Sequence, residues 1–279
     1  MKYTLYLISS LALCFSSCTS IQLAIPHQFS TQATKMPVKG LKHWTGRGSV
    51  SFGEYRTSKI KRGWNTTSTR PKFLSELSTE EAILMVMGAP VQNLRSNQKT
   101  KYQYSIQDRN LVADVFCFER KTEESSEIKT GSRWLGDLAQ TKNYQYQFSA
   151  AIRSTAKEHK EPWKVVLYNN YHWMKDTARR ILDHPYIEEE GYATDGKDTI
   201  HINPVRVTNF TTKSGRDAKF PVKILTGYEL RIGDGVIAII DAFGHNLWMY
   251  NELDAPTRLI VASVSSALLL RQVQDVTGG

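Results

Sequence analysis

The sequence predicts a mainly β protein of the α+β class, in which antiparallel sheets form a sandwich or an open barrel and a C-terminal helix packs on a sheet. Turn signals recur along most of the chain at intervals of about eight to twelve residues. Between the turns, apolar and polar residues alternate with the period of a half-buried strand. The chain has 279 residues, of which 41% are hydrophobic. This composition is enough for a substantial buried core.

The first 17 residues are predicted to be a signal peptide. Lys2 supplies a positive start, and Leu5–Phe15 is an apolar run of 11 residues. A helix of that length would rise about 16 Å, roughly half the thickness of a bilayer's hydrocarbon core. A cleaved export signal therefore fits this run better than a transmembrane span does.

Ser16 and Ser17 precede Cys18, with an apolar residue before them. This pattern resembles the lipobox of bacterial lipoproteins, in which two small residues precede the cysteine that receives lipid. The resemblance implies that Cys18 carries palmitate and other acyl chains and becomes the first residue of the mature protein. The alternative is an ordinary secretory signal that is cut after Cys18. Thr19 follows the cysteine, and the lack of an aspartate there favours sorting to the outer membrane.

Residues 18–40 are polar, contain two prolines and show no sustained period, so we expect a flexible tether there. We expect residues 41–279 to form the β-rich globular domain, with a division into two subdomains near 155–162 as an alternative. After cleavage, Cys117 is the one cysteine left besides the lipidated one. We expect a buried, inert thiol at Cys117 because it falls on the apolar face of a predicted strand.

The segment from Lys35 to Lys72 contains ten basic residues and one acid, Glu54. A basic surface close to a lipid anchor is suited to anionic lipid headgroups or envelope glycans. An exported protein does not meet nucleic acid, so that partner is not expected. The alternative is a solvated sheet edge protected by its charges. The residues that we expect to contact an anionic surface are Lys39, Lys42, Arg47, Lys59, Lys61 and Arg62.

The strands are predicted in the following order. Residues 102–106 and 111–117 form a hairpin around Asp108–Asn110, and "NYQYQFSAAI" and "WKVVLY" are two further strands. A turn at Asp195–Gly196 and two more near residues 233–235 and 243–246 divide the rest of the chain into strands. Ser78 and Glu81 form a capping box that predicts a helix ending near residue 88. In the C-terminal helix, Leu268 is expected to be buried against a sheet.

The sequence contains no complete catalytic, metal-binding or cofactor motif, so we predict no catalytic residue, metal ligand or cofactor. His172 and His184 lie in an acid-rich stretch that has the residue types of a metal site. A solvated loop is the alternative for this stretch.

The strands "NYQYQFSAAI" and "WKVVLY" and the ending "LWMYNEL … RLIVASVSSALLLR" are similar to those of lipoproteins of bacterial cell envelopes that have no assigned activity. The run around Gly88 and Pro90, followed by Tyr102 and Tyr104, also resembles small lipoproteins that assist outer-membrane protein assembly. These features predict a lipid-anchored envelope protein with a non-enzymatic binding or structural role and an unassigned oligomeric state. The alternatives are an envelope hydrolase and an accessory factor in outer-membrane protein assembly.

Overall fold

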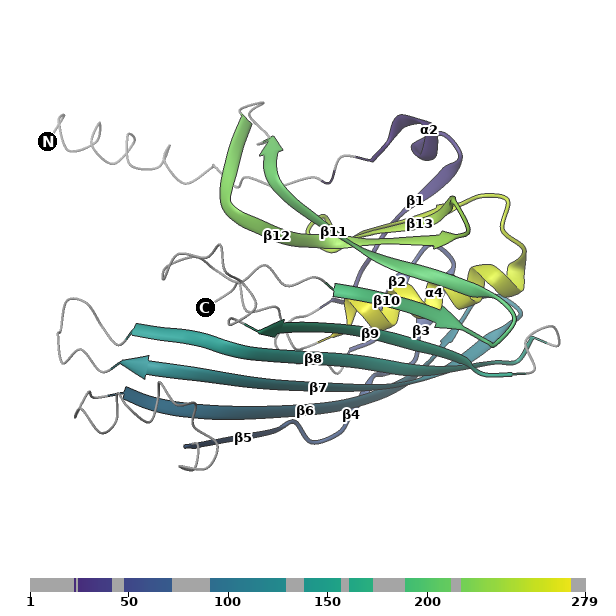
Figure 1. Ribbon diagram of the computed structural model, residues 1–279. Coiled ribbons are helices and arrows are strands. Elements are labelled where there is room, and N and C mark those ends of the chain that lie inside the picture. Colours follow the sequence, from purple (N-terminus) through teal and green to yellow (C-terminus); the bar gives the residue numbers. More distant parts are fainter. Residues whose placement is uncertain are drawn as a thin grey trace, which may run out of the picture.

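The computed structural model describes residues 23, 25–41, 48–71, 91–128, 138–156, 161–172, 189–211 and 217–271 (Figure 1). In chain order, the elements are α2 (His27–Ser30), β1 (Ala33–Pro37), β2 (Ser51–Phe52), β3 (Tyr55–Thr57), β4 (Lys61–Arg62), β5 (Thr66–Pro71), β6 (Val91–Gln107), β7 (Val112–Ile128), β8 (Leu138–Ser154), β9 (Trp163–His172), β10 (Glu189–Thr194), β11 (Thr199–Thr211), β12 (Asp217–Ile232), β13 (Gly235–Asp241), β14 (Asn246–Tyr250) and α4 (Ala255–Leu269). The helix predicted from the capping box at Ser78 lies outside the described residues.

The strands form one antiparallel sheet in the order β1-β14-β13-β12-β11-β10-β9-β8-β7-β6-β3-β2, and β4 and β5 also pair with β6. From β6 to β14 every strand pairs with the next strand in the chain, so this part of the sheet is a meander. Strands β8 and β9 flank residues 155–162, the position of the alternative subdomain boundary, and they pair with each other. Strands from both sides of this position therefore belong to one sheet.

Two of the predicted turns have the local chemistry that the sequence indicated. The Asp108 carboxylate accepts hydrogen bonds from the backbone N–H of Asn110 (2.8 Å) and Leu111 (2.7 Å), which closes the turn between β6 and β7. Gly196 has a φ of +95° between β10 and β11, a conformation that residues with a Cβ rarely adopt. Both predicted turns are confirmed.

The sheet curves until its two ends nearly meet, which confirms the open-barrel form of the prediction (Figure 1). Past the end of β1, the N–H of Lys39 donates to the carbonyl of Ser51 (2.8 Å), and the N–H of Ser51 donates back (3.0 Å). Among the described residues, this bridge joins the two ends of the sheet at one end of the barrel.

The tether predicted over residues 18–40 is wrong in its second half, because β1 lies within it. β1 pairs with β14, and the side chain of Met36 is buried in the core. A strand of five residues at a sheet edge has little sequence signal of its own. Its partner lies more than 200 residues away in the chain, with Ala33 opposite Tyr250.

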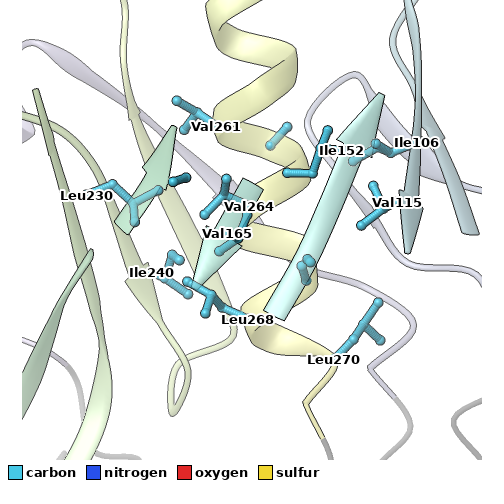
Figure 2. Close-up of a cluster of buried hydrophobic side chains, with 14 of the residues drawn as sticks. Ile106, Val115, Ile152, Val165, Leu230, Ile240, Val261, Val264, Leu268 and Leu270 are labelled. Atoms are coloured by element: carbon cyan, nitrogen blue, oxygen red, sulfur yellow. The ribbon is translucent and has the colours of Figure 1, made fainter. Parts of the chain in front are cut away.

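Alternation along the long strands separates an apolar inner face from a polar outer face. Val115 on β7, Ile152 on β8 and Val165 on β9 point inward and are fully or almost fully buried (Figure 2). Their neighbours along each strand point outward. This alternation gives the barrel an outer surface on which polar side chains stand in rows across several strands.

Helix α4 lies inside the curved sheet, which confirms the predicted packing of the C-terminal helix. Asp254 caps its N-terminus by accepting a hydrogen bond from the N–H of Thr257 (2.8 Å). All residues from Leu259 to Leu268 are buried, and Leu270 is buried as well. Figure 2 shows Val261, Val264 and Leu268 among inward side chains of the sheet. The helix is apolar on most faces because the sheet surrounds it.

Candidate functional site

The outer face of β5, β6 and β7 carries a basic hollow, by which we mean the concave surface of about 500 Å³ whose lining residues are Thr66, Ser68, Arg70, Arg95, Asn97, Lys99 and Arg120. Four of these side chains are cationic, and none of the lining residues in the described part of the chain is acidic. The remaining three are hydroxyl or amide side chains. The hollow therefore offers hydrogen-bond donors of positive charge together with neutral polar groups.

Strand register brings these residues together. Arg70 lies opposite Arg95, Ser68 opposite Asn97 and Thr66 opposite Lys99, so alternate residues of β5 and β6 face outward as pairs. On the other side of β6, Lys99 lies opposite Arg120 of β7. Directly opposite residues in an antiparallel pair have Cβ atoms about 5 Å apart. Like charges at that spacing repel one another, and an anion between them would relieve the repulsion.

Hydrogen bonds beside the basic hollow fix part of its wall. The Thr122 hydroxyl donates to the side-chain oxygen of Asn97 (3.0 Å). Glu124 lies next to the hollow, with its carboxylate 3.7 Å from Nε of Arg95, and accepts a hydrogen bond from the Asn143 amide (2.6 Å). The carboxylate neutralises one cation and orients the Arg95 guanidinium. Planar guanidinium groups bind phosphate, sulfate and carboxylate groups through paired N–H donors.

A second concave surface adjoins the first on the outer face of β7, β8 and β9. We call it the amide hollow; it has a volume of about 430 Å³ and is lined by Arg120, Thr122, Gln145, Tyr146, Gln147, Val166 and Tyr168. Arg120 lines both hollows. The Tyr168 hydroxyl donates to Glu190 (3.0 Å), and this hydrogen bond to a carboxylate raises the pKa of Tyr168. The ring of Tyr168 is thereby held in place at the surface.

Of the predicted contact residues that the structure describes, none lines either hollow. Lys39, Lys59 and Lys61 are exposed, whereas Lys42 and Arg47 lie outside the described residues.

Arg62 differs from the expectation of a surface contact. Its guanidinium donates to the Leu270 carbonyl (2.9 Å) and lies over the Tyr102 ring at 4.9 Å. Burial lowers the pKa of Arg62. The last carbonyls of a helix have no hydrogen-bond donor within the helix, and Arg62 points into the barrel, where it supplies a donor to one of them at the end of α4.

A polar cluster inside the barrel adjoins the C-terminal end of α4. Nη1 of Arg271 lies 2.7 Å from Oε1 of Glu189, and the Tyr228 hydroxyl donates to Oε2 of Glu189 (3.0 Å). The guanidinium lies between the rings of Tyr146 (5.1 Å) and Tyr228 (5.3 Å). Burial alone would lower the pKa of Arg271, but the attraction of Glu189 and the two rings holds that pKa well above its usual value.

This interior cluster has a structural explanation. The Tyr102 hydroxyl donates to the carbonyl of Ala267 (2.7 Å), and Tyr104 and Ser266 share a hydrogen bond of 2.7 Å. With Arg62 and Arg271, these tyrosines fasten the last turn of α4 to the sheet. The charged and phenolic groups here pair with one another and with the helix.

Cys117 is buried on the inner face of β7, so the predicted burial of this cysteine is confirmed. Burial raises the pKa of its thiol, which disfavours the reactive thiolate. Cys18, His184 and the side chain of His172 lie outside the described part of the chain. Among the described residues, no three His, Cys, Asp or Glu side chains are grouped so as to hold a metal ion. Searches of family models, curated proteins and solved structures found no match to the chain.

The sequence interpretation missed Arg95, Lys99 and Arg120. The signal that could have found two of them is the alternation of Arg95, Asn97 and Lys99, which places three polar side chains on one face of a strand. Arg120 has no such signal, because its place beside Lys99 depends on the pairing of β6 with β7. No described helix has both the length and the apolar character needed to span a bilayer.

Proposed function

We propose that this protein is a lipid-anchored component of the bacterial cell envelope with a non-enzymatic binding role, and that the basic hollow is its binding surface for anionic ligands. The observation that carries the proposal is the gathering of four cationic side chains around one concavity without an acidic lining residue. A ligand with phosphate, sulfate or carboxylate groups is the chemistry that such a surface recognises.

The alternative of a solvated, protective sheet edge accounts less well for this arrangement. Charges that protect an edge need only stand on the outermost strand. Here, the cations come from β5, β6 and β7, and Arg120 stands two strands in from β5. The hydroxyl groups of Thr66 and Ser68 add donors and acceptors that edge protection does not need. A concave, mixed surface is typical of a binding site.

The proposed lipid anchor at Cys18 gives the binding role its setting. A chain with two or more acyl groups is held at a membrane much more firmly than one acyl group allows. The protein would then present its outer face to anionic polymers or headgroups near that membrane. Their local concentration there is high, so the binding surface would stay occupied even at modest affinity.

The test uses the full chain with Cys18→Ser, which removes the lipid, and long-chain polyphosphate as the probe. A hollow variant carries Arg95→Gln, Lys99→Gln and Arg120→Gln. The matched control carries Lys39→Gln, Lys59→Gln and Lys61→Gln, which removes the same charge from three exposed lysines elsewhere. We expect the hollow variant to weaken binding about tenfold or more and the control to weaken it less than about threefold.

Two outcomes would contradict the proposal. Equal weakening in both variants would show that net charge alone governs binding. Loss in the control variant alone would favour the surface predicted from the sequence over the basic hollow. Binding should also fall as salt rises from about 0.05 to 0.5 M, because exposed charges are screened over a few ångströms at the higher concentration.

A further inference from the structure

We infer that the anionic ligand is an extended acidic glycan whose charged groups occupy the basic hollow and whose sugar hydroxyls occupy the amide hollow. This inference rests on the function proposed above and names the class of ligand for the same face. The two hollows share Arg120, so a single molecule lying in both would pass over its guanidinium.

The lining of the amide hollow is suited to neutral polar groups. Gln145 and Gln147 are exposed, and each amide supplies two donors and an acceptor. Sugar hydroxyl groups likewise donate and accept. Tyr168 is 43% exposed, and its hydroxyl is held by Glu190, which leaves an apolar ring for the C–H face of a sugar. Phosphate, by contrast, offers these amides mainly acceptor oxygens and has no C–H face for the Tyr168 ring.

The register of the strands sets the size and direction of the ligand. Residues of one outward row lie opposite one another on consecutive strands, in the order Thr66, Lys99, Arg120, Gln147 and Tyr168. The row crosses five strands, and four strand spacings of about 4.8 Å make it about 19 Å long. A ligand that contacts both ends must be longer than one sugar and must run across the strands.

The same cations would also attract anionic lipid headgroups, but the geometry favours a glycan. A bilayer presents a broad surface, and proteins that rest on it commonly insert aromatic and apolar side chains. The residues around Arg120 form concavities with amides and hydroxyls in their walls. A flexible polymer can enter such concavities, whereas a flat layer of headgroups rests on their rims.

The experiment again uses the Cys18→Ser chain, with three probes: a hexamer of galacturonic acid, the single sugar acid and short-chain polyphosphate with the charge of the hexamer. The test variant carries Gln145→Ala and Gln147→Ala. Its matched control carries Gln103→Ala and Gln107→Ala, which removes two exposed glutamines from the outer face of β6. Tyr168→Ala is paired with Phe243→Ala, an aromatic residue of similar exposure at 44% that lies between β13 and β14. Melting temperatures confirm that each variant is folded.

We expect the hexamer to bind more tightly than the single sugar, and the Gln145/Gln147 variant to weaken hexamer binding about fivefold or more while polyphosphate binding stays within about twofold. Tyr168→Ala should act in the same direction, and both control variants should bind as the parent does. Equal effects on hexamer and polyphosphate would overturn the inference while leaving the basic hollow as an anion site.

Binding to anionic vesicles through the basic hollow, without binding of the hexamer, would also overturn the inference and would assign the face to lipid headgroups. If polyphosphate binding does not depend on Arg95, Lys99 and Arg120, then the proposed function itself fails. The glycan inference would fall with it. The polyphosphate measurements therefore separate the two failures.

Discussion

Replacing Arg271 with Met tests whether the interior cluster fastens α4 to the sheet. The Arg271 side chain is 8% exposed, and that of its partner Glu189 is 0% exposed. Met keeps much of the length and apolar volume of the arginine stem while removing its charge. The variant therefore leaves Glu189 buried, with the Tyr228 hydroxyl as its hydrogen-bond donor.

The expected cost follows from this burial. Removing one partner of a buried ion pair typically destabilises a protein by about 3 to 5 kcal/mol, because the other charge stays buried without compensation. This is a large share of the total stability of about 5 to 15 kcal/mol that is usual for a domain. The Arg271→Met, Glu189→Gln double variant removes both charges, and we expect it to be more stable than Arg271→Met alone.

The assay is urea unfolding of the Cys18→Ser chain, followed by circular dichroism and fluorescence. The control is Arg153→Met, because the Arg153 side chain is 72% exposed and its pair with Asp114 (3.2 Å) lies on the surface. We expect this control to cost less than about 1 kcal/mol. A cost below about 1 kcal/mol for Arg271→Met as well would refute the view that the cluster holds the helix in place.

Three further predictions concern the core, pH and the lipid. Leu268→Ala should cost about 2 to 5 kcal/mol in urea unfolding, because Leu268 is buried in α4; a truncation that removes α4 but stays soluble with an unchanged melting temperature would contradict this. Burial raises the pKa values of Cys117 and Tyr104, so the unfolded chain loses these protons first and stability should fall as pH rises above about 8.5, where a thiol in an unfolded chain titrates. Urea midpoints between pH 7 and pH 10 measure this fall in stability. Cys117→Ala should make the fall less steep. Stability that does not change over this pH range would contradict the view that Cys117 and Tyr104 are buried in their protonated forms. Cys18→Ser should abolish incorporation of labelled palmitate, and continued labelling would place the lipid elsewhere.

Much of the fold could be predicted because its signals are local. The β6–β7 turn depends on Asp108 and its neighbours, and the apolar alternation of β8 and β9 is visible within single strands. The C-terminal helix is marked by an uncharged run and by the Asp254 cap. These features rely on residues that are close together in the chain.

The features that could not be predicted depend on distant pairing. The five residues of β1 have the sequence character of a tether, and they form a strand only through pairing with β14, more than 200 residues away in the chain. Arg62 was expected at the surface, although the last turn of α4 draws its guanidinium inward. The basic hollow likewise forms only when β5, β6 and β7 align Arg70, Arg95 and Arg120 on one face.

The most direct test of the basic hollow as the binding surface is the rate at which Lys99 reacts with an amine-labelling reagent, measured by mass spectrometry with and without polyphosphate. Lys99 is exposed and lines the hollow, whereas Lys39, Lys59 and Lys61 are exposed elsewhere, so all four should react in the free protein. At a ligand concentration about ten times the Kd, about nine-tenths of the sites are filled. We predict that labelling of Lys99 then slows about tenfold while the other three lysines react as before. Unchanged labelling of Lys99, or equal slowing at all four lysines, would contradict a binding surface at the basic hollow.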